Sequence, residues 1–171
     1  LMVTLGTGLG SGIVAEGKVV RGKHGLGGEL GHTRAYHCGD RLCGCDRMDC
    51  LERYASATGV AFTAVQFVKQ KRTGILYEKY NERIAEIKAK LLKKNSKLNS
   101  EKDEKEIKKM KAQIAELERE DELPIRSRDV YDAAEKKDDL ALEIFAFTGE
   151  ILGESLANFV AFSDPDKIFL F

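Results

Sequence analysis

The residues best suited to chemistry lie in one stretch, GELGHTRAYHCGDRLCGCDRMDCLERYAS, at positions 28–56. It holds all four cysteines of the chain and two of its three histidines. Cys43, Cys45 and Cys50 form a C-x-C-x4-C pattern, and His32 lies eleven residues before the first of them. Three thiolates and one imidazole suit a tetrahedral site for structural zinc. We therefore predict a Cys3His zinc site.

Other interpretations of these residues remain open on spacing alone. A disulfide is disfavoured because the single residue between Cys43 and Cys45 constrains the bridge geometry, which leaves free reduced thiols as the alternative. Cys38 and His37 are competing ligands, and His37 could replace His32 in a purely local cluster. His24 has no such partner, and we expect it to be a loop or surface residue.

Composition limits the class of protein. A chain of 171 residues is long enough for one domain with its own core. Its 28 basic and 28 acidic side chains balance, so nothing resembles the basic stripe of a nucleic-acid binder. No apolar run approaches the roughly 20 residues that span a bilayer, and we expect no signal peptide. Clustered cysteines favour an intracellular thiolate site over a secreted scaffold, so we expect a cytoplasmic protein.

The two ends suggest a piece of a longer protein. The chain opens on the strand pattern LMVTLGTG and stops on the apolar strand pattern KIFLF. A core strand needs flanking chain to reach the surface, so natural termini rarely cut one this closely. We therefore expect residues 1–171 to be one domain, trimmed at both ends.

The elements around the cysteine stretch alternate between strand and helix patterns. Residues 12–21 form a predicted hairpin around Glu16-Gly17, and 22–31 are too rich in glycine for a regular element. Residues 51–71 are helical, with a break near SATG. The short helix DVYDAAEKKD and the long helix DLALEIFAFTGEILGESLANFVAF precede KIFLF. The long helix is apolar on more than one face, so we predict that it lies in the core of an α/β domain.

Residues 74–124 differ from the rest by their high charge. Apolar residues recur at helical spacing in ILYEKYNERIAEIKAKLLKK and again in SEKDEKEIKKMKAQIAELERE. NSKLNS is the expected turn, and Ser100 with Asp103 resembles a capping box. We predict an antiparallel helical hairpin with one apolar stripe, and a dimerising coiled coil is the alternative.

Several motifs together resemble the ROK family, named for its repressors, open reading frames and sugar kinases. They are TLGTGLGSGIVAEGKVVRGKHGLGGELGH, CGCDRMDCLERYASATGV and RDVYDAAEKKDDLALEIFAFTGEILGESLANFVAFSDPDKIFLF. The combination of E-x-G-H with C-x-C-x4-C-x-E is highly specific. The similarity covers residues 1 to about 70 and 125–171, so only the charged hairpin lies outside it.

The resemblance implies an actin-like, ribonuclease-H-like fold of two lobes. Residues 1–171 would be most of the larger, C-terminal lobe, and 74–124 an insertion of unknown purpose. The resemblance also assigns His32, rather than His37, to the structural zinc with Cys43, Cys45 and Cys50.

The family likeness further implies a sugar pocket beside the zinc. Glu29 of E-x-G-H and Glu52, two residues past the last cysteine, would bind sugar hydroxyls, and His32 would also approach the sugar. Carboxylates accept hydrogen bonds from hydroxyl groups in a fixed pattern, which fits this role. From the residues alone, Glu52 fits equally well as a charge at a helix N-terminus, and Glu29 as an ordinary loop carboxylate.

The glycine-rich segment GTGLGSG resembles the family's second phosphate-binding turn. Glycines let the backbone approach ATP phosphates closely, so we predict phosphate contacts from backbone N–H groups. The residues concerned are Thr7, Gly8, Gly10, Ser11 and Gly12. The turn by itself fits plain hairpin geometry equally well, and its position after a strand and before ELGH favours the phosphate role.

Some family features differ or are missing. Asp46 and Asp49 stand where the family has glycine, and aspartate tolerates left-handed backbone better than most residues. No Asn-Asp pair and no D-x-G-x-T motif occur in the chain, and no glycine run follows IFLF to hold adenine. The resemblance places the catalytic aspartate in the smaller lobe, so we assign no catalytic residue here and expect the isolated chain to be inactive.

The resulting functional expectation is an ATP-dependent hexose kinase of carbohydrate metabolism and glycolysis, most simply a glucokinase, with magnesium screening the phosphates. Amino-sugar kinases and fructokinases share the motifs. The resemblance to the family also implies that the protein forms a homodimer or homotetramer. A sugar-sensing transcriptional regulator, with its DNA-binding domain outside these residues, is the main alternative. A zinc-stabilised scaffold without activity is the third.

Overall fold

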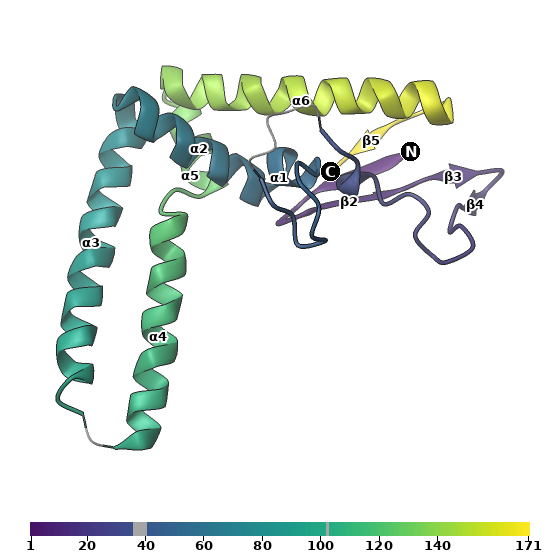
Figure 1. Cartoon of the computed structure of the whole chain (residues 1–171). Coiled ribbons are helices and arrows are strands. Elements are labelled where there is room, and N and C mark those ends of the chain that lie inside the picture. The colour runs from purple at the N-terminus through teal and green to yellow at the C-terminus, as the bar shows by residue number, and fades with distance from the viewer. Residues whose placement is uncertain (36–40, 102) are drawn as a thin grey trace.

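The computed structural model describes residues 1–35, 41–101 and 103–171, without the side chains of 119–122. Its sheet has three strands in the order β2-β1-β5 (Figure 1). Strand β1 (Met2–Leu5) pairs antiparallel with β2 (Leu9–Gly12), with Leu5 opposite Leu9. The closing strand β5 (Phe169–Leu170) lies parallel to β1, with Met2 opposite Phe169. The predicted strands at both ends of the chain are therefore neighbours in one sheet.

The glycine-rich region beyond β2 follows the sequence pattern. Strands β3 (Val14–Ala15) and β4 (Lys18–Val19) form the predicted antiparallel hairpin. Its turn residues Glu16 and Gly17 have φ angles of 51° and 73°, as a two-residue hairpin turn of this kind requires. An irregular loop then leads to the short 3-10 helix η1 (Leu30–His32), which carries the end of the E-x-G-H motif.

The helix predicted for residues 51–71 is broken near SATG, as expected. It consists of α1 (Glu52–Ala55) and α2 (Ala57–Lys71). Ser56 separates them in an extended conformation, and its side chain caps α2 by accepting a hydrogen bond from the Gly59 N–H at 3.1 Å. A Cβ at Gly59 would lie 2.6 Å from the Tyr54 backbone, so this close approach of the two helices requires glycine.

Residues 74–122 form two long helices that project away from the sheet, α3 (Gly74–Leu98) and α4 (Glu104–Glu122) (Figure 1). They pack against each other through the apolar stripe seen in the sequence, in which Ile87, Ile114 and Leu117 are buried. The capping box predicted from Ser100 is wrong. Asp103 caps α4 by accepting hydrogen bonds from the Lys105 and Glu106 N–H groups, because α3 continues to Leu98 and Ser100 instead donates to the Lys97 carbonyl at 2.9 Å.

Helices α5 (Ser127–Ala134) and α6 (Asp139–Ser163) return the chain to the sheet. The prediction that α6 lies within the core is only half right. One face is buried along Ile144, Thr148, Ile151, Ser155 and Phe159. Leu142, Phe145 and Val160 lie on the opposite face and are exposed, because none of the described residues covers that face. Phe162 is also exposed, close to the C-terminal end of the helix.

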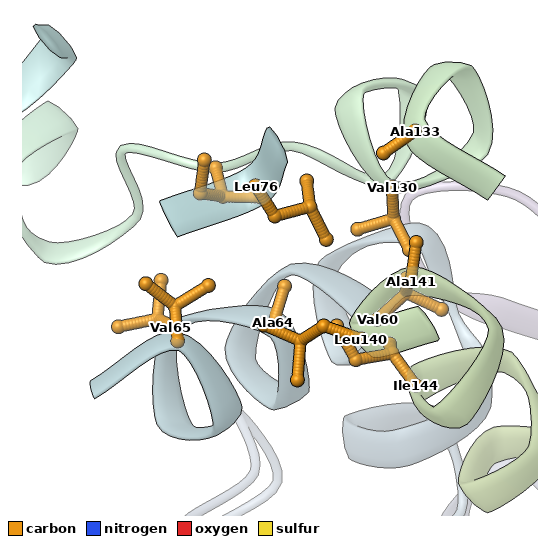
Figure 2. Packing of buried hydrophobic residues seen from close by; sticks show 11 residues of the cluster. Val60, Ala64, Val65, Leu76, Val130, Ala133, Leu140, Ala141 and Ile144 are labelled. Atoms are coloured by element: carbon orange, nitrogen blue, oxygen red, sulfur yellow. The ribbon is translucent and has the colours of Figure 1, made fainter. Parts of the chain in front are cut away.

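Helix α6 joins two separate apolar cores. The first lies between α2, the start of α3, α5 and the first half of α6 (Figure 2). Leu76, Val130 and Ile144 are fully buried there. The second core lies between β1, β2, α1 and the second half of α6, and Val3 and Leu51 are its fully buried members. The second core supports the cysteine loop, and the first supports the base of the hairpin.

Two buried aspartates fix the base of the hairpin to the rest of the domain. Asp138 accepts from the Ile75 N–H at 2.6 Å with one oxygen and from the Ala141 N–H at 2.9 Å with the other, so it caps the starts of α3 and α6 together. Asp129 of α5 forms ion pairs with Lys79 and Arg83 of α3. The hairpin therefore leaves the domain in a defined direction. Among the described helices, none combines enough length and apolar character to cross a membrane.

Candidate metal and sugar site

The structure brings together the four residues predicted to bind zinc. One possible ligand atom from each of His32, Cys43, Cys45 and Cys50 lies within 4.8 Å of all the others. The Cys43 Sγ is 3.7 Å from the His32 Nδ1, and the Cys45 and Cys50 Sγ atoms are 3.5 Å apart. In a tetrahedron with Zn–S bonds of about 2.3 Å and Zn–N bonds of about 2.0 Å, neighbouring ligand atoms are about 3.5–3.8 Å apart. The cluster could therefore hold a metal ion, because its donor atoms are of suitable types and lie close together.

The loop that carries the cysteines needs left-handed backbone at two positions. Asp46 and Asp49 have φ angles of 62° and 60°, where the ROK resemblance leads one to expect glycine. The first turn is closed by hydrogen bonds from the Cys43 N–H to the Arg47 carbonyl and from the Asp46 N–H to the Cys43 carbonyl, at 2.9 and 3.0 Å. Aspartate tolerates this conformation better than most residues, which explains how the loop keeps its shape without glycine.

Asp49 also organises the loop, a role that the sequence analysis missed. Its side chain is fully buried and accepts a hydrogen bond from the Tyr54 hydroxyl at 2.6 Å and from the Arg41 N–H at 3.4 Å. Arg34 forms an ion pair with the same carboxylate at 3.8 Å. An aspartate five residues before a tyrosine gives no distinctive sequence signal, so only the fold identifies this role.

Arg41 is the second organising residue that the sequence did not reveal. Its guanidinium is stacked over the Tyr54 ring, 4.2 Å from the ring centroid, and only 6% of the residue is exposed. It donates hydrogen bonds to the Arg53 carbonyl at 2.8 Å, the Thr63 hydroxyl at 3.0 Å and the Gln66 amide oxygen at 2.6 Å. These contacts attach the cysteine loop to α1 and α2.

The three thiols differ in acidity for local reasons. Burial, as the largest cause, raises the pKa of Cys43 to about 12, and burial also raises that of Cys50. A hydrogen bond from the Arg47 backbone N–H lowers the pKa of the exposed Cys45 to about 6. Buried thiols this close together do not all ionise without a compensating cation. A divalent ion would supply that charge and deprotonate its ligands.

Glu52 lies between the cysteine cluster and the glycine-rich turn. One carboxylate oxygen accepts from the Cys43 thiol at 3.1 Å and is 3.9 Å from the His32 Nδ1. The other accepts from the Leu9 N–H at 3.4 Å, and a Cβ at Gly8 would come within 2.8 Å of it. The structure therefore places Glu52 beside His32, at the first residue of α1.

Glu29 is exposed and stands immediately before η1, on the same short turn as His32. Its position depends on Ser11 of β2, whose hydroxyl donates to the Gly28 carbonyl at 2.5 Å and accepts from the Leu30 N–H at 2.9 Å. A Cβ at Gly31 would lie 2.3 Å from the Leu9 carbonyl oxygen, so only glycine allows η1 to lie against β2. The Ser11 side chain thus holds the E-x-G-H segment from both sides of Glu29.

The residues predicted to contact phosphate fall into two structural groups. Thr7 and Gly8 lie in the turn between β1 and β2. Gly10, Ser11 and Gly12 belong to strand β2, where some of the backbone N–H and C=O groups are taken up by pairing with β1. The turn rests on the start of α2. The Ala57 N–H donates to the Gly6 carbonyl at 2.9 Å, and the Thr58 hydroxyl donates to the Thr7 carbonyl at 2.8 Å.

The competing metal ligands proposed from the sequence, His37 and Cys38, lie outside the described residues. His24 lies in the exposed glycine-rich loop and is not a member of the cluster.

The ROK family model matches residues 1–170, and the chain therefore belongs to the ROK family. It is 29% identical over 171 residues to the glucokinase of Halalkalibacterium halodurans, covering 98% of this chain and 39% of that protein. It is 47% identical over 64 residues to an N-acetylmannosamine kinase of Salmonella arizonae, covering 37% of this chain and 22% of the relative. The chain thus spans well under half the length of these two relatives.

Solved structures agree with the family assignment. A ROK family glucokinase from Streptomyces griseus, in complex with glucose and AMPPNP, matches with a TM-score of 0.63 and 25% identity. That match covers 99% of this chain and 42% of the glucokinase chain. A ROK family transcriptional regulator, a homologue of the E. coli MLC protein, has a similar fold, with a TM-score of 0.62 over 99% of this chain and 32% of its own. The fold is therefore the mixed α/β fold of ROK proteins.

Proposed function

We propose that this chain is most of the larger lobe of an ATP-dependent hexose kinase, with its smaller lobe outside residues 1–171. The observation that carries the proposal is the position of Glu52. One of its oxygens contacts the cysteine and histidine cluster, and the other contacts the Leu9 N–H beside the turn predicted to bind phosphate. Phosphoryl transfer requires the accepting hydroxyl and the phosphate to be held side by side, and Glu52 would lie between the two proposed sites.

In this proposal Glu29, His32 and Glu52 bind the sugar. Glu29 is exposed, and the His32 and Glu52 side chains are 34% and 23% exposed, so all three can meet a ligand. Ionised carboxylates accept hydrogen bonds from adjacent sugar hydroxyls, and the fixed spacing of the acceptors would discriminate among sugars.

Structural zinc would be held by His32, Cys43, Cys45 and Cys50. When bound, it would tie η1 to the cysteine loop and so fix the E-x-G-H segment relative to Glu52. The chain's own residues already support this arrangement, since Ser11 holds the segment around Glu29 and Asp49 and Arg41 hold the loop.

The turn at Thr7 and Gly8 would receive phosphate oxygens of ATP, with magnesium screening their charge. The base that removes the proton from the sugar hydroxyl is not assigned to this chain, which contains no Asn-Asp pair. We therefore propose that it is an aspartate of the smaller lobe, and that residues 1–171 alone do not phosphorylate sugars.

The sugar site is tested by Glu52→Gln, which keeps the size of the side chain and removes its charge. We expect unchanged zinc content and a sugar affinity weakened by about tenfold, because hydrogen bonds to a charged acceptor are the stronger ones. Calorimetric titration of the chain with glucose and with N-acetylmannosamine measures this. Glu154→Gln, an exposed position on α6, is the matched control. Undiminished sugar affinity in Glu52→Gln would remove Glu52 from the pocket.

The activity itself is tested by ADP release from the complete protein with ATP, magnesium and separate additions of glucose, N-acetylmannosamine, N-acetylglucosamine and fructose. Turnover with one sugar would establish the kinase and its substrate together. The fold match to a transcriptional regulator supports the alternative of a sugar sensor. Sugar binding without turnover, together with a DNA-binding domain elsewhere in the protein, would establish that alternative.

A further inference from the structure

The helical hairpin forms one wall of a cavity next to the turn predicted to bind phosphate. The cavity has a volume of about 410 Å³. Four segments line it: the turn after β1, the first residues of α2, the second half of α4, and the segment from Leu123 to the first residue of α5. The residues on its walls include Thr7, Ala57, Ala61, Glu116, Leu123 and Arg126. Glu116 belongs to the hairpin, and Leu123 follows its last residue.

The position of this cavity limits what it can hold. Thr7 lines it, and the Thr58 hydroxyl fixes the Thr7 carbonyl at 2.8 Å. If the turn binds the phosphates of ATP, the rest of the nucleotide must leave the turn on a side where there is space. The cavity begins at Thr7, and its volume lies within the range of about 300–1,000 Å³ found for small-molecule sites.

The lining suits a nucleoside. Ala57, Ala61 and Leu123 offer apolar surface for a flat base. Glu116 is an exposed carboxylate, which can accept hydrogen bonds from the neighbouring hydroxyls of a ribose. Arg126 is an exposed cation on the same wall, and its charge would favour a polyphosphate nearby.

The hairpin wall is held firmly against the domain. Arg83 of α3 donates to the Pro124 carbonyl at 2.8 Å, next to Leu123, and also forms an ion pair with the buried Asp129. The Asp129 carboxylate accepts in turn from the Arg126 N–H at 2.9 Å. The side of the cavity that contains Leu123 and Arg126 is therefore fixed by the same contacts that anchor the hairpin.

We propose that the hairpin is part of the nucleotide site, and that Glu116 binds the ribose hydroxyls of the phosphate donor. This inference rests on the proposed kinase function and assigns a role to a segment that the family resemblance leaves unexplained. The apolar part of the cavity receives the base, and the phosphates extend to Thr7. Glu116 then determines whether the donor must carry a ribose with both hydroxyls.

The test compares three ligands on the 171-residue chain by calorimetric titration with magnesium: ATP, 2′,3′-dideoxy-ATP and inorganic tripolyphosphate. The variant is Glu116→Gln. Glu118→Gln is the matched control, because it makes the same change on an exposed position of the same helix that does not line the cavity.

We expect the unsubstituted chain and Glu118→Gln to bind ATP about tenfold more tightly than dideoxy-ATP, a ratio that corresponds to the loss of charge-assisted hydrogen bonds. In Glu116→Gln the ratio should fall to about one, with tripolyphosphate affinity unchanged. An unaltered ratio in Glu116→Gln would overturn the inference and leave the phosphate site intact. If neither ATP nor tripolyphosphate binds, the proposed nucleotide site fails, and this inference fails with it.

Discussion

The cysteine loop and the helical hairpin are both well-defined segments, but they reach their shape in different ways. The hairpin depends on local periodicity, with Ile87 of α3 and Ile114 and Leu117 of α4 all buried where the two helices pack together. The loop has little regular structure, and its shape depends on residues from other elements. Arg41 and Asp49 connect it to α1 and α2, and the four side chains predicted to bind a metal converge from η1 and the loop.

This contrast indicates where single substitutions should change stability or binding. In the hairpin many side chains are exposed, so we expect most substitutions there to have local effects. In the loop, one side chain can position several segments together. Substitutions in the loop should therefore affect both stability and binding, whereas most substitutions in the hairpin should affect only local stability.

The largest effect should come from Cys45→Ser. Cys45 is exposed, so without a metal its replacement by the similar serine should shift Tm by only about 1–2 °C. If it binds structural zinc, metal binding contributes to folding, and we expect loss of zinc and a fall in Tm of about 10 °C. Metal analysis and calorimetry measure both. Cys38→Ser is the control, and loss of zinc from that variant instead would support the local cluster with Cys38.

The next largest effect should come from Asp129→Asn at the base of the hairpin. The Asp129 side chain is 6% exposed, and the substitution removes its ion pairs with Lys79 and Arg83. We expect a loss of about 2 kcal/mol of unfolding free energy, less than for a fully buried pair because both partners are partly exposed. Urea unfolding at pH 7 measures it. Asp132→Asn, whose partner Arg128 is exposed, should cost about 0.5 kcal/mol or less.

The stability that the Asp129 carboxylate contributes should depend on pH. Burial, the largest single influence, raises the pKa of Asp129, but hydrogen bonds from Lys79, the Arg126 backbone and Arg83 outweigh it and leave the pKa lowered. A lowered pKa in the folded state means that the stabilisation is complete above the unfolded value of about 3.9 and is lost as the pH falls through the folded value. The difference in stability between the unsubstituted chain and Asp129→Asn should therefore be constant from pH 7 to 5 and shrink below about pH 4. A difference that stays constant to pH 2 would contradict this assignment.

A smaller effect on stability, combined with a specific effect on binding, should follow from Ser11→Ala. The substitution removes two hydrogen bonds that hold the segment around Glu29, which we expect to cost about 1–2 kcal/mol. Sugar affinity should fall while zinc content stays the same, because the metal ligands are not changed. Thermal unfolding and sugar titration of one preparation test this. Unchanged sugar affinity would mean that the position of Glu29 in the sugar site does not depend on Ser11.

The smallest effect should come from Asp103→Ala, which removes the cap of α4 at the far end of the hairpin. Loss of such a cap typically costs about 1 kcal/mol. We expect faster hydrogen exchange in the first turn of α4 and no change in zinc or sugar binding. Ser100→Ala, at the position that the sequence suggested as the cap, should have almost no effect. Equal effects from the two variants would contradict the cap assignment.

Much of the fold could be predicted because its signals are local. The hairpin around Glu16-Gly17, the break at Ser56 and the stripe of α3 and α4 all follow from residue types within a few positions. The cap of α4 was misplaced by three residues, because serine and aspartate are both good caps and the length of α3 decides between them. The exposed face of α6 was also missed, since apolar periodicity shows which faces are apolar but not whether anything covers them.

For the candidate site, the sequence by itself determined the residue types. Thiolates and an imidazole at metal-ligand spacing define the chemistry, and E-x-G-H with C-x-C-x4-C-x-E is specific enough to indicate the family. The tertiary structure decided that Glu52 reaches both the cysteine cluster and Leu9, that Ser11 holds the segment around Glu29, and that Glu116 of the hairpin lines the same cavity as Thr7. These contacts join residues far apart in the chain. Their geometry depends on how the strands and helices pack, and residue type and spacing do not contain that information.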